Sequence, residues 1–195
     1  MTRLGKNRTR PSQSDKYATS EDFCQVFAHS LDPLYVLSLL LTGDHELAER
    51  CFIAGLEECV QSNRVFSEWA HCWAKRIIVQ NAIRALQPYP GHVNGSLSTT
   101  SMCNSRESVR LGDFELYGVL ALGGFERFVF VMSVLERYSD RDCALLLGCS
   151  LQEVGEARIR ALKGMEELAR TDPRRDVVTW RASRQVRTAL NAQGD

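Results

Sequence analysis

The stretch SDRDCALLLGCSLQEVGEARIRAL, residues 139–162, carries the strongest structural signal in the sequence. It holds two capping boxes, in each of which a serine is followed three residues later by a carboxylate: Ser139 with Asp142, and Ser150 with Glu153. Each box is typical of the beginning of a helix. The spacing therefore predicts a short helix that begins after Ser139 and a second helix that begins after Ser150.

The residues between and after the two boxes are those that a tight helical corner needs. Gly148 stands where the turn requires a residue that tolerates positive φ, and Ala144 is small where the second helix would cross closely. Val154 is a branched apolar residue that would face inward. This combination predicts a helix-turn-helix, in which the second helix enters the DNA major groove. The alternative is an ordinary helical corner that binds no DNA.

The second helix of this corner carries the side chains that we expect to contact DNA. Gln152 is suited to read adenine, and the cations are suited to neutralise backbone phosphates. Glu156 is expected on the same exposed face, where phosphate would repel it. The predicted DNA-binding residues of this helix are Ser150, Leu151, Gln152, Gly155, Arg158, Arg160 and Lys163.

The whole chain predicts an all-α fold of two small helical domains joined by a polar linker. Helical patterning runs from about residue 20 to residue 86 and returns over residues 114–170, without strand-type alternation of useful length. Residues 87–112 are rich in Pro, Gly, Ser, Thr and Asn, which is typical of linkers. The expected organisation is a disordered basic arm (1–18), a first domain (19–87), a linker (88–112), a second domain (113–170) and a basic, weakly helical C-terminal tail (171–195).

Two helices are expected to define the first domain. Asp44 is the expected N-cap of a helix with an apolar stripe at helical period. Another long helix is expected over residues 65–86, ended by the prolines that follow. Its Phe66, Trp69 and Trp73 recur at i, i+3 and i+7, which favours core packing. Aromatic rings interleaved with cations also suit stacking on unpaired bases, so both interpretations stay open.

Length and composition exclude several classes of protein. The 195 residues are 44% hydrophobic and 25% charged, which is typical of a globular chain. The longest apolar run, residues 34–41, is far too short for a membrane span, and the polar N-terminus shows no secretory signal. We therefore expect a cytoplasmic protein that does not engage a membrane.

The cysteines, histidines and other reactive residues form no metal-binding or catalytic pattern in the sequence. The seven cysteines show no metal-type spacing, and His71 beside Cys72 completes no site, so we expect reduced cysteines that fill core gaps and no metal or other cofactor. No nucleophile–base pair or phosphate-binding loop is present in the sequence. We expect neither an enzyme nor a small-molecule substrate.

The formal net charge of zero is a sum of unlike segments. Residues 17–60 carry one basic and eight acidic side chains, whereas residues 61–86 carry four basic and one acidic. Residues 151–170, which include the expected DNA-contacting helix, carry four of each. A charge run is most often a solvated face, but opposed blocks in one small protein also suit two different partners.

Residues 122–162 carry a spaced set of side chains that extends the helix-turn-helix signal upstream. Its members are Leu122, Arg127, Val129, Phe130, Leu135, Tyr138, Ser139, Asp142, Ala144, Leu147, Gly148, Val154, Arg160, Ala161 and Leu162. Without a gap, this set resembles region 4 of the sigma-70 family of transcription factors, which reads R-x-V-F … L-x-x-L/Y-S … E-I-A … L-G-x-S … T-V … R-A. The segment that reads Gly-Thr-Val-Lys-Ser-Arg in the family reads Gln-Glu-Val-Gly-Glu-Ala here (152–157), so that two cations are lost and two acids are gained.

A second set, in the N-terminal half, follows the order of region 2 of the same family in its extracytoplasmic-function type. Its members are Leu34, Tyr35, Leu41, Thr42, Gly43, Asp44, Ala48, Glu49, Phe52, Trp73, Arg76, Ile77, Asn81, Ala82, Ile83 and Arg84. The two resemblances together cover most of residues 23–165. The chain is therefore similar to a divergent sigma factor.

The resemblance implies specific partners and further site residues. In the family, region 2 binds core RNA polymerase and melts the −10 element, while region 4 reads the −35 element and contacts the polymerase flap. It implies polymerase contacts at Asp44, Glu46 and Glu49, and an anti-sigma protein as a further partner. The implied promoter-DNA contacts of the region 2-like part are Trp69, Trp73, Lys75, Arg76, Gln80, Asn81 and Arg84.

Three functional hypotheses follow from the sequence. The leading hypothesis is a sigma-like transcription initiation factor that binds core RNA polymerase and promoter DNA. The alternative is a divergent sigma paralogue that regulates through protein contacts, with weak or no promoter recognition. A repressor that uses only the helix-turn-helix would leave the region 2 resemblance unexplained.

Overall fold

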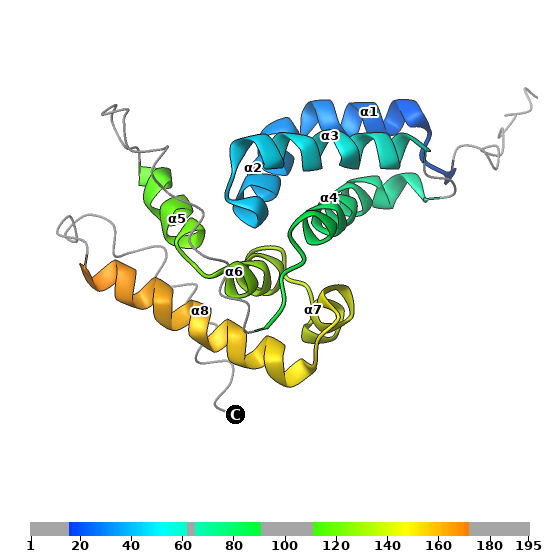
Figure 1. The fold of residues 1–195 in the computed structure, drawn as a ribbon. Helices are drawn as coiled ribbons and strands as arrows, with labels where there is room; N and C mark the ends of the chain where they lie inside the picture. The colour runs from blue at the N-terminus through cyan, green and yellow to red at the C-terminus, as the bar shows by residue number, and fades with distance from the viewer. Residues whose placement is uncertain (1–15, 62–64, 91–110, 172–195) are drawn as a thin grey trace, which may run out of the picture.

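The computed structural model describes residues 16–61, 65–90 and 111–171 (Figure 1). Most of the expected basic arm, most of the linker and nearly all of the C-terminal tail lie outside these ranges. Within them, every regular element is helical, and the only strand-like feature is an isolated bridge between Tyr17 and Phe66. The all-α prediction is confirmed, while the domain boundaries stay a prediction.

The N-terminal half, residues 16–61 and 65–90, contains four α-helices and one short 3₁₀ turn. The elements are α1 (Ser20–His29), α2 (Leu31–Thr42), α3 (His45–Gln61), η2 (Ser67–Trp69) and α4 (Ala70–Leu86). Thr19 begins α1 with a complete capping box to Asp22. Gly43 ends α2 in the left-handed region, at φ 71°.

The apolar stripes of these helices meet in a core around α2 and α3. In Figure 1, α1 and α3 lie side by side, and α4 lies beneath them. Phe23, Leu34, Leu41 and Ile78 are almost completely buried there. Gly55 lies where α3 and α4 approach closely, since an added Cβ would lie 3.0 Å from the side chain of Ile78.

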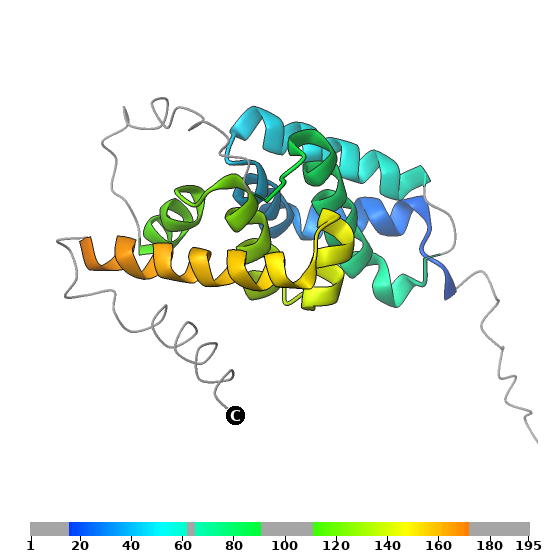
Figure 2. The same ribbon diagram turned by 60° about the horizontal axis from the view of Figure 1, so that its bottom comes forward.

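The C-terminal half, residues 111–171, is built around its last and longest helix. The elements are α5 (Leu111–Leu120), α6 (Gly124–Phe130), a π-helical turn η4 (Val131–Leu135), α7 (Asp140–Leu147) and α8 (Leu151–Thr171). Figure 2 shows α8 running along this half, where it packs against α5, α6 and α7. Arg137, between η4 and α7, has a φ of 59°, an uncommon conformation for a residue with a side chain.

The two halves pack directly on one another through a shared apolar core. Helix α2 contacts α5, α6 and η4, while α4 contacts α7. The buried side chains form one continuous cluster that includes Leu41 from the first half and Phe128 and Met132 from the second. The arrangement of the halves is therefore fixed by burial and not only by the chain that connects them.

The prediction of a single helix over residues 65–86 is wrong for the beginning of that helix. Phe66 is in extended conformation because it pairs with Tyr17, and Ala18 donates a hydrogen bond of 2.7 Å to the carbonyl of Val65. The 3₁₀ turn η2 intervenes, and the α-helix begins only at Ala70. The core-packing interpretation also fails for Phe66 and Trp69, which are 36% and 58% exposed.

Two further tests of the described residues concern membranes and metals. No single described helix is long and apolar enough to span a membrane, and α1 with α2 reaches that length and composition only as a pair bent by 79°. The described residues contain no group of three or more His, Cys, Asp or Glu side chains that could hold a metal ion.

Candidate nucleic-acid interface

Helices α7 and α8 form a corner whose two N-termini are capped as the sequence predicts. The Ser139 hydroxyl accepts a hydrogen bond of 3.1 Å from the backbone N–H of Asp142. At α8, the N–H of Glu153 donates to the Ser150 hydroxyl, and the N–H of Ser150 donates to the Glu153 carboxylate over 2.7 Å. Gly148 ends α7 with a φ of 67°. The sequence thus determines the α7–α8 corner locally.

The buried and exposed faces of α8 also follow the sequence pattern. Val154, Ala157 and Ala161 are completely buried against the rest of the C-terminal half. Leu151 and Gln152, in the first turn, are exposed. An added Cβ at Gly155 would meet nothing within 4 Å, so this position faces open space. The N-terminal part of α8 therefore presents a free surface to a partner.

Arg160, a predicted DNA-contacting cation of α8, is already paired with carboxylates. Its Nε donates a hydrogen bond of 2.9 Å to Glu126 of α6, and its Nη1 lies 3.9 Å from the carboxylate of Glu156. Gln152 donates a hydrogen bond of 2.9 Å to the same Glu156. Arg160 and Gln152, which are predicted to contact phosphate and adenine, are thus both bound to carboxylates.

Arg158, another predicted DNA-contacting residue, holds the corner together instead. Its guanidinium forms a two-pronged ion pair with the carboxylate of Asp140, in the first turn of α7, and only 21% of its side chain is exposed. Lys163 is exposed and forms no ion pair with any residue in the described ranges. Of the three predicted cations of α8, Lys163 therefore has the least competition for a phosphate.

The same corner exposes three apolar side chains, of which only Leu151 was predicted as part of the site. Leu145 of α7 is 74% exposed, and Leu151 and Ile159 of α8 are 54% and 48% exposed. Such residues add contact area with a protein or with thymine methyl groups, but they add nothing to phosphate binding. Their helical period could have identified them, since they lie off the buried stripe.

The predicted aromatic platform of the N-terminal half is divided between the surface and the core. Trp69 is exposed and meets Phe66 edge-on at 5.3 Å, while Phe66 stacks on Tyr17 at 5.0 Å. Trp73 packs against the core instead, and its Nε1 is buried without a hydrogen-bond partner. Of the two tryptophans, only Trp69 presents its ring to a partner.

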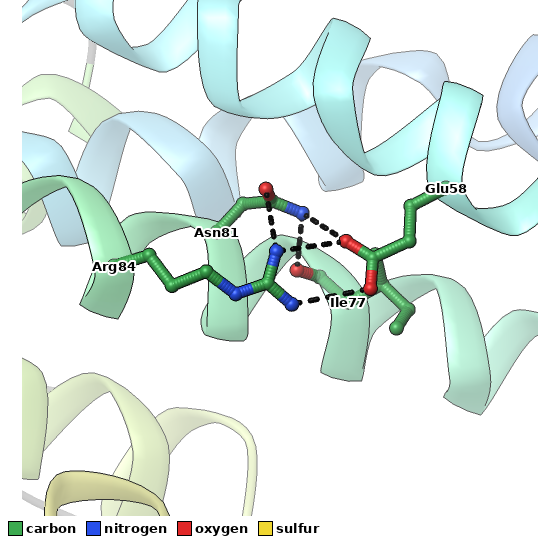
Figure 3. A network of polar contacts seen from close by, with 4 residues as sticks. All are labelled: Glu58, Ile77, Asn81 and Arg84. Carbon is green, nitrogen blue, oxygen red and sulfur yellow. Dashed lines mark hydrogen bonds and ion pairs between the residues drawn. The ribbon is translucent and has the colours of Figure 1, made fainter.

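The predicted contacts near the end of α4 are bound to one carboxylate (Figure 3). The Arg84 guanidinium donates hydrogen bonds of 2.9 and 3.1 Å to the two oxygens of Glu58, and the Asn81 amide donates one of 3.2 Å to the same carboxylate. Asn81 also donates to the carbonyl of Ile77. The bonds from Arg84 hold the pKa of Glu58 below its ordinary value. This network joins α4 to α3.

Lys75 and Arg76, two of the remaining predicted residues of α4, lie close to side chains of the C-terminal half. Lys75 forms an ion pair of 2.7 Å with Glu136, with 29% and 18% of the two side chains exposed. Arg76 and Gln80 are half-buried. Burial raises the pKa of Tyr138, near Arg76, to about 12. Lys75 therefore joins the two halves of the molecule.

The three residues predicted to bind polymerase lie at the beginning of α3. Asp44 caps this helix, as predicted, by accepting a hydrogen bond of 2.8 Å from the N–H of Leu47. Glu46 and Glu49 are exposed. The two glutamates are therefore available to a basic surface, whereas one oxygen of Asp44 is engaged by the helix.

Arg127 has a structural role that the sequence analysis did not identify. It is only 9% exposed, and its guanidinium donates to the carbonyls of Leu41 and Thr42 at the end of α2, both over 3.2 Å, and to Leu120 over 3.4 Å. Burial lowers the pKa of Arg127. A cation at the C-terminus of a helix is favoured by the helix dipole. Arg127 thus caps α2 from the other half of the chain.

The comparisons with known proteins find a distant structural likeness. No family model matches the chain, and no curated protein matches it. A solved structure of the sigma factor RpoE in complex with the anti-sigma factor NepR, from Bartonella quintana, is similar to this chain with 19% identity and a TM-score of 0.46. The match covers 78% of this chain and 99% of that chain. At this distance it assigns no role to any residue.

Proposed function

We propose that this protein is a sigma-like transcription regulator that binds core RNA polymerase and contacts promoter DNA with α8. The observation that carries the proposal is the α7–α8 corner, with its left-handed Gly148 turn and the exposed first turn of α8. The residues that form this corner are those in which the sequence resembles region 4. The proposed role is regulatory, and no catalytic chemistry is part of it.

The polymerase contact is proposed for the acidic beginning of α3. Glu46 and Glu49 are exposed on successive turns of that helix. Exposed carboxylates suit a basic partner surface, since complementary charge steers association and fixes its orientation. The sequence resemblance to region 2 names the same position. By the same resemblance, an anti-sigma protein is a further candidate partner.

A second function is favoured by the ion pairs on the candidate DNA surface. Arg160 is held by Glu126 and Glu156, and Arg158 is held by Asp140. The same corner exposes Leu145 and Leu151. A surface with balanced charge and exposed apolar groups suits a protein partner better than a polyanion. Under this second proposal, the chain regulates transcription through protein contacts and recognises promoters weakly or not at all.

Reconstitution with core RNA polymerase distinguishes the two proposals. Stable association together with promoter-specific transcripts supports the first proposal. Association without transcripts supports the second. No association with polymerase contradicts both. Glu46→Lys with Glu49→Lys should weaken association at low salt, whereas reversal of the exposed Glu166 on α8 should leave it unchanged.

A pair of substitutions on α8 tests its placement on DNA. Gly155→Lys with Glu156→Ser adds a cation and removes an acid on the exposed face, where the Gly155 position has room for a side chain. Duplex DNA affinity should rise in a binding assay at moderate salt. Ala169→Lys is the matched control, since it adds a cation to the far, exposed end of the same helix. An equal gain in the control would contradict this placement.

A further inference from the structure

We propose that Glu126 and Glu156 are internal counter-ions that occupy Arg160 and weaken the contact of α8 with DNA phosphate. The proposal rests on the proposed placement of α8 against DNA. It adds a specificity role for Glu126, which lies on α6 and not on the helix that would enter the groove. The two carboxylates would lower the affinity of α8 for the DNA backbone while leaving the helix folded and accessible.

The geometry places both carboxylates on the one guanidinium. Glu126 accepts a hydrogen bond of 2.9 Å from Arg160 Nε, and Glu156 lies one helical turn before Arg160, at 3.9 Å. A phosphate oxygen would seek the same donors, because charge-assisted bonds from arginine are the usual contacts to a DNA backbone. Phosphate must therefore displace carboxylates that are already in place.

Glu126 is held in position more firmly than an ordinary surface glutamate. Its side chain is 26% exposed, compared with 53% for Glu156 and 50% for Arg160. Its carboxylate also lies against Gly123, where an added Cβ would be 2.7 Å from Oε2. Because α6 packs along α8, the position of Glu126 is set by the fold of the C-terminal half. The counter-ion is thus part of the packed structure.

Glu156 also binds the side chain of Gln152, a second residue predicted to contact DNA. It accepts a hydrogen bond of 2.9 Å from the amide of Gln152, the side chain suited to adenine. Its negative charge stays on the exposed face even when this bond breaks, so it would repel a backbone phosphate. Removal of both carboxylates should therefore free Arg160 and Gln152 together.

The experiment compares charge-neutral variants of the full chain in a DNA-binding titration. Glu126→Gln with Glu156→Gln should bind a labelled duplex about tenfold more tightly at moderate salt, with a salt dependence steeper by about one counter-ion. Glu166→Gln is the matched control, since it removes the same charge from α8 and breaks an ion pair with Arg170 near the helix end. The control should stay within about twofold of the unmodified chain.

The outcomes separate this inference from the proposed function. An affinity of the double variant within about twofold of the unmodified chain, or an equal gain in Glu166→Gln, overturns the inference. Addition of Arg160→Ala to the double variant should remove most of the gain, and a gain that persists also overturns it. Polymerase association of the unmodified chain tests the proposed function separately. Glu156→Gln alone, at an exposed position, should give a smaller gain and serves as the readout where the double variant does not fold.

Discussion

Arg127 lies at the contact between the two halves, and Arg160 lies on the outer face of α8. The two arginines use their positive charge in different ways. Arg127 is almost completely buried and donates to three backbone carbonyls, two of them at the end of α2. Arg160 is half exposed and is paired with two side-chain carboxylates. The first arginine satisfies backbone carbonyls in a buried place that water does not reach freely, whereas water or a ligand can replace the partners of the second.

This difference indicates that stability and partner binding depend on different parts of the molecule. A buried donor that is lost leaves unsatisfied carbonyls, which is costly, whereas an exposed ion pair contributes little net free energy. We therefore expect the fold to depend on the contact between the halves, and partner choice to depend on α8.

The largest effect is expected at Arg127. Arg127→Met should lower the free energy of unfolding by about 2–4 kcal/mol, because the carbonyls of Leu41 and Thr42 lose their donor. Urea denaturation followed by circular dichroism measures this change. The control is Arg141→Met, at an exposed position on α7, which should change stability by less than about 0.5 kcal/mol. Equal effects at the two positions would contradict the capping role of Arg127.

A comparison of Gly43 with Gly148 tests the contact between Arg127 and the end of α2. Both have positive φ, but an added Cβ at Gly43 would lie 2.9 Å from Arg127 Nη1, whereas one at Gly148 would meet nothing within 4 Å. Gly148→Ala should cost about 1 kcal/mol for the left-handed backbone alone, and Gly43→Ala about 2–3 kcal/mol. Thermal and urea unfolding measure both. In an Arg127→Met background the extra cost of Gly43→Ala should disappear.

The ion pair between Lys75 and Glu136 should have an intermediate effect. It joins the two halves, and its side chains are 29% and 18% exposed, whereas each of the other ion pairs described has at least one side chain that is 41% or more exposed. A double-mutant cycle with Lys75→Ala and Glu136→Ala should give a coupling energy of about 1 kcal/mol. A coupling energy near zero would show that apolar burial alone holds the halves together.

The smallest effect is expected at the exposed network of Glu58, Asn81 and Arg84. Glu58→Gln should lower the free energy of unfolding by less than about 1 kcal/mol at neutral pH. Because Arg84 lowers the pKa of Glu58 in the folded state, this stabilisation is present above the ordinary value of 4.5 and is lost as the pH falls through the folded-state value. Unfolding measured from pH 7 to pH 3 should show the two chains converging. A difference that stays unchanged from pH 7 to pH 3 would contradict the assignment.

Much of the local structure could be predicted from the sequence, because caps and apolar periodicity act over a few residues. The caps at Asp44, Ser139 and Ser150 and the turn at Gly148 are all present as predicted. The beginning of α4 could not be predicted, since the pairing of Phe66 with Tyr17 joins residues that are far apart in the chain. The roles of the candidate DNA- and polymerase-binding residues stay predictions.

The sequence also could not predict which charged side chains of the candidate site form ion pairs. Segment charges placed four basic and four acidic side chains over residues 151–170, but they did not indicate which cations would be paired. Arg160 meets Glu126 across 34 positions, Arg84 meets Glu58 across 26, and Lys75 meets Glu136 across 61. Pairings over such separations depend on how the helices pack.

The sequence by itself determined that the chain is helical, where the α7–α8 corner turns and which face of α8 is buried. These features follow from hydrogen bonds and apolar spacing within one or two helical turns. The tertiary structure alone decided that Arg127 caps α2 and that Glu126 occupies Arg160. The physical reason is that the charge available on a surface depends on the partners that packing brings within hydrogen-bond distance, and those partners come from other helices.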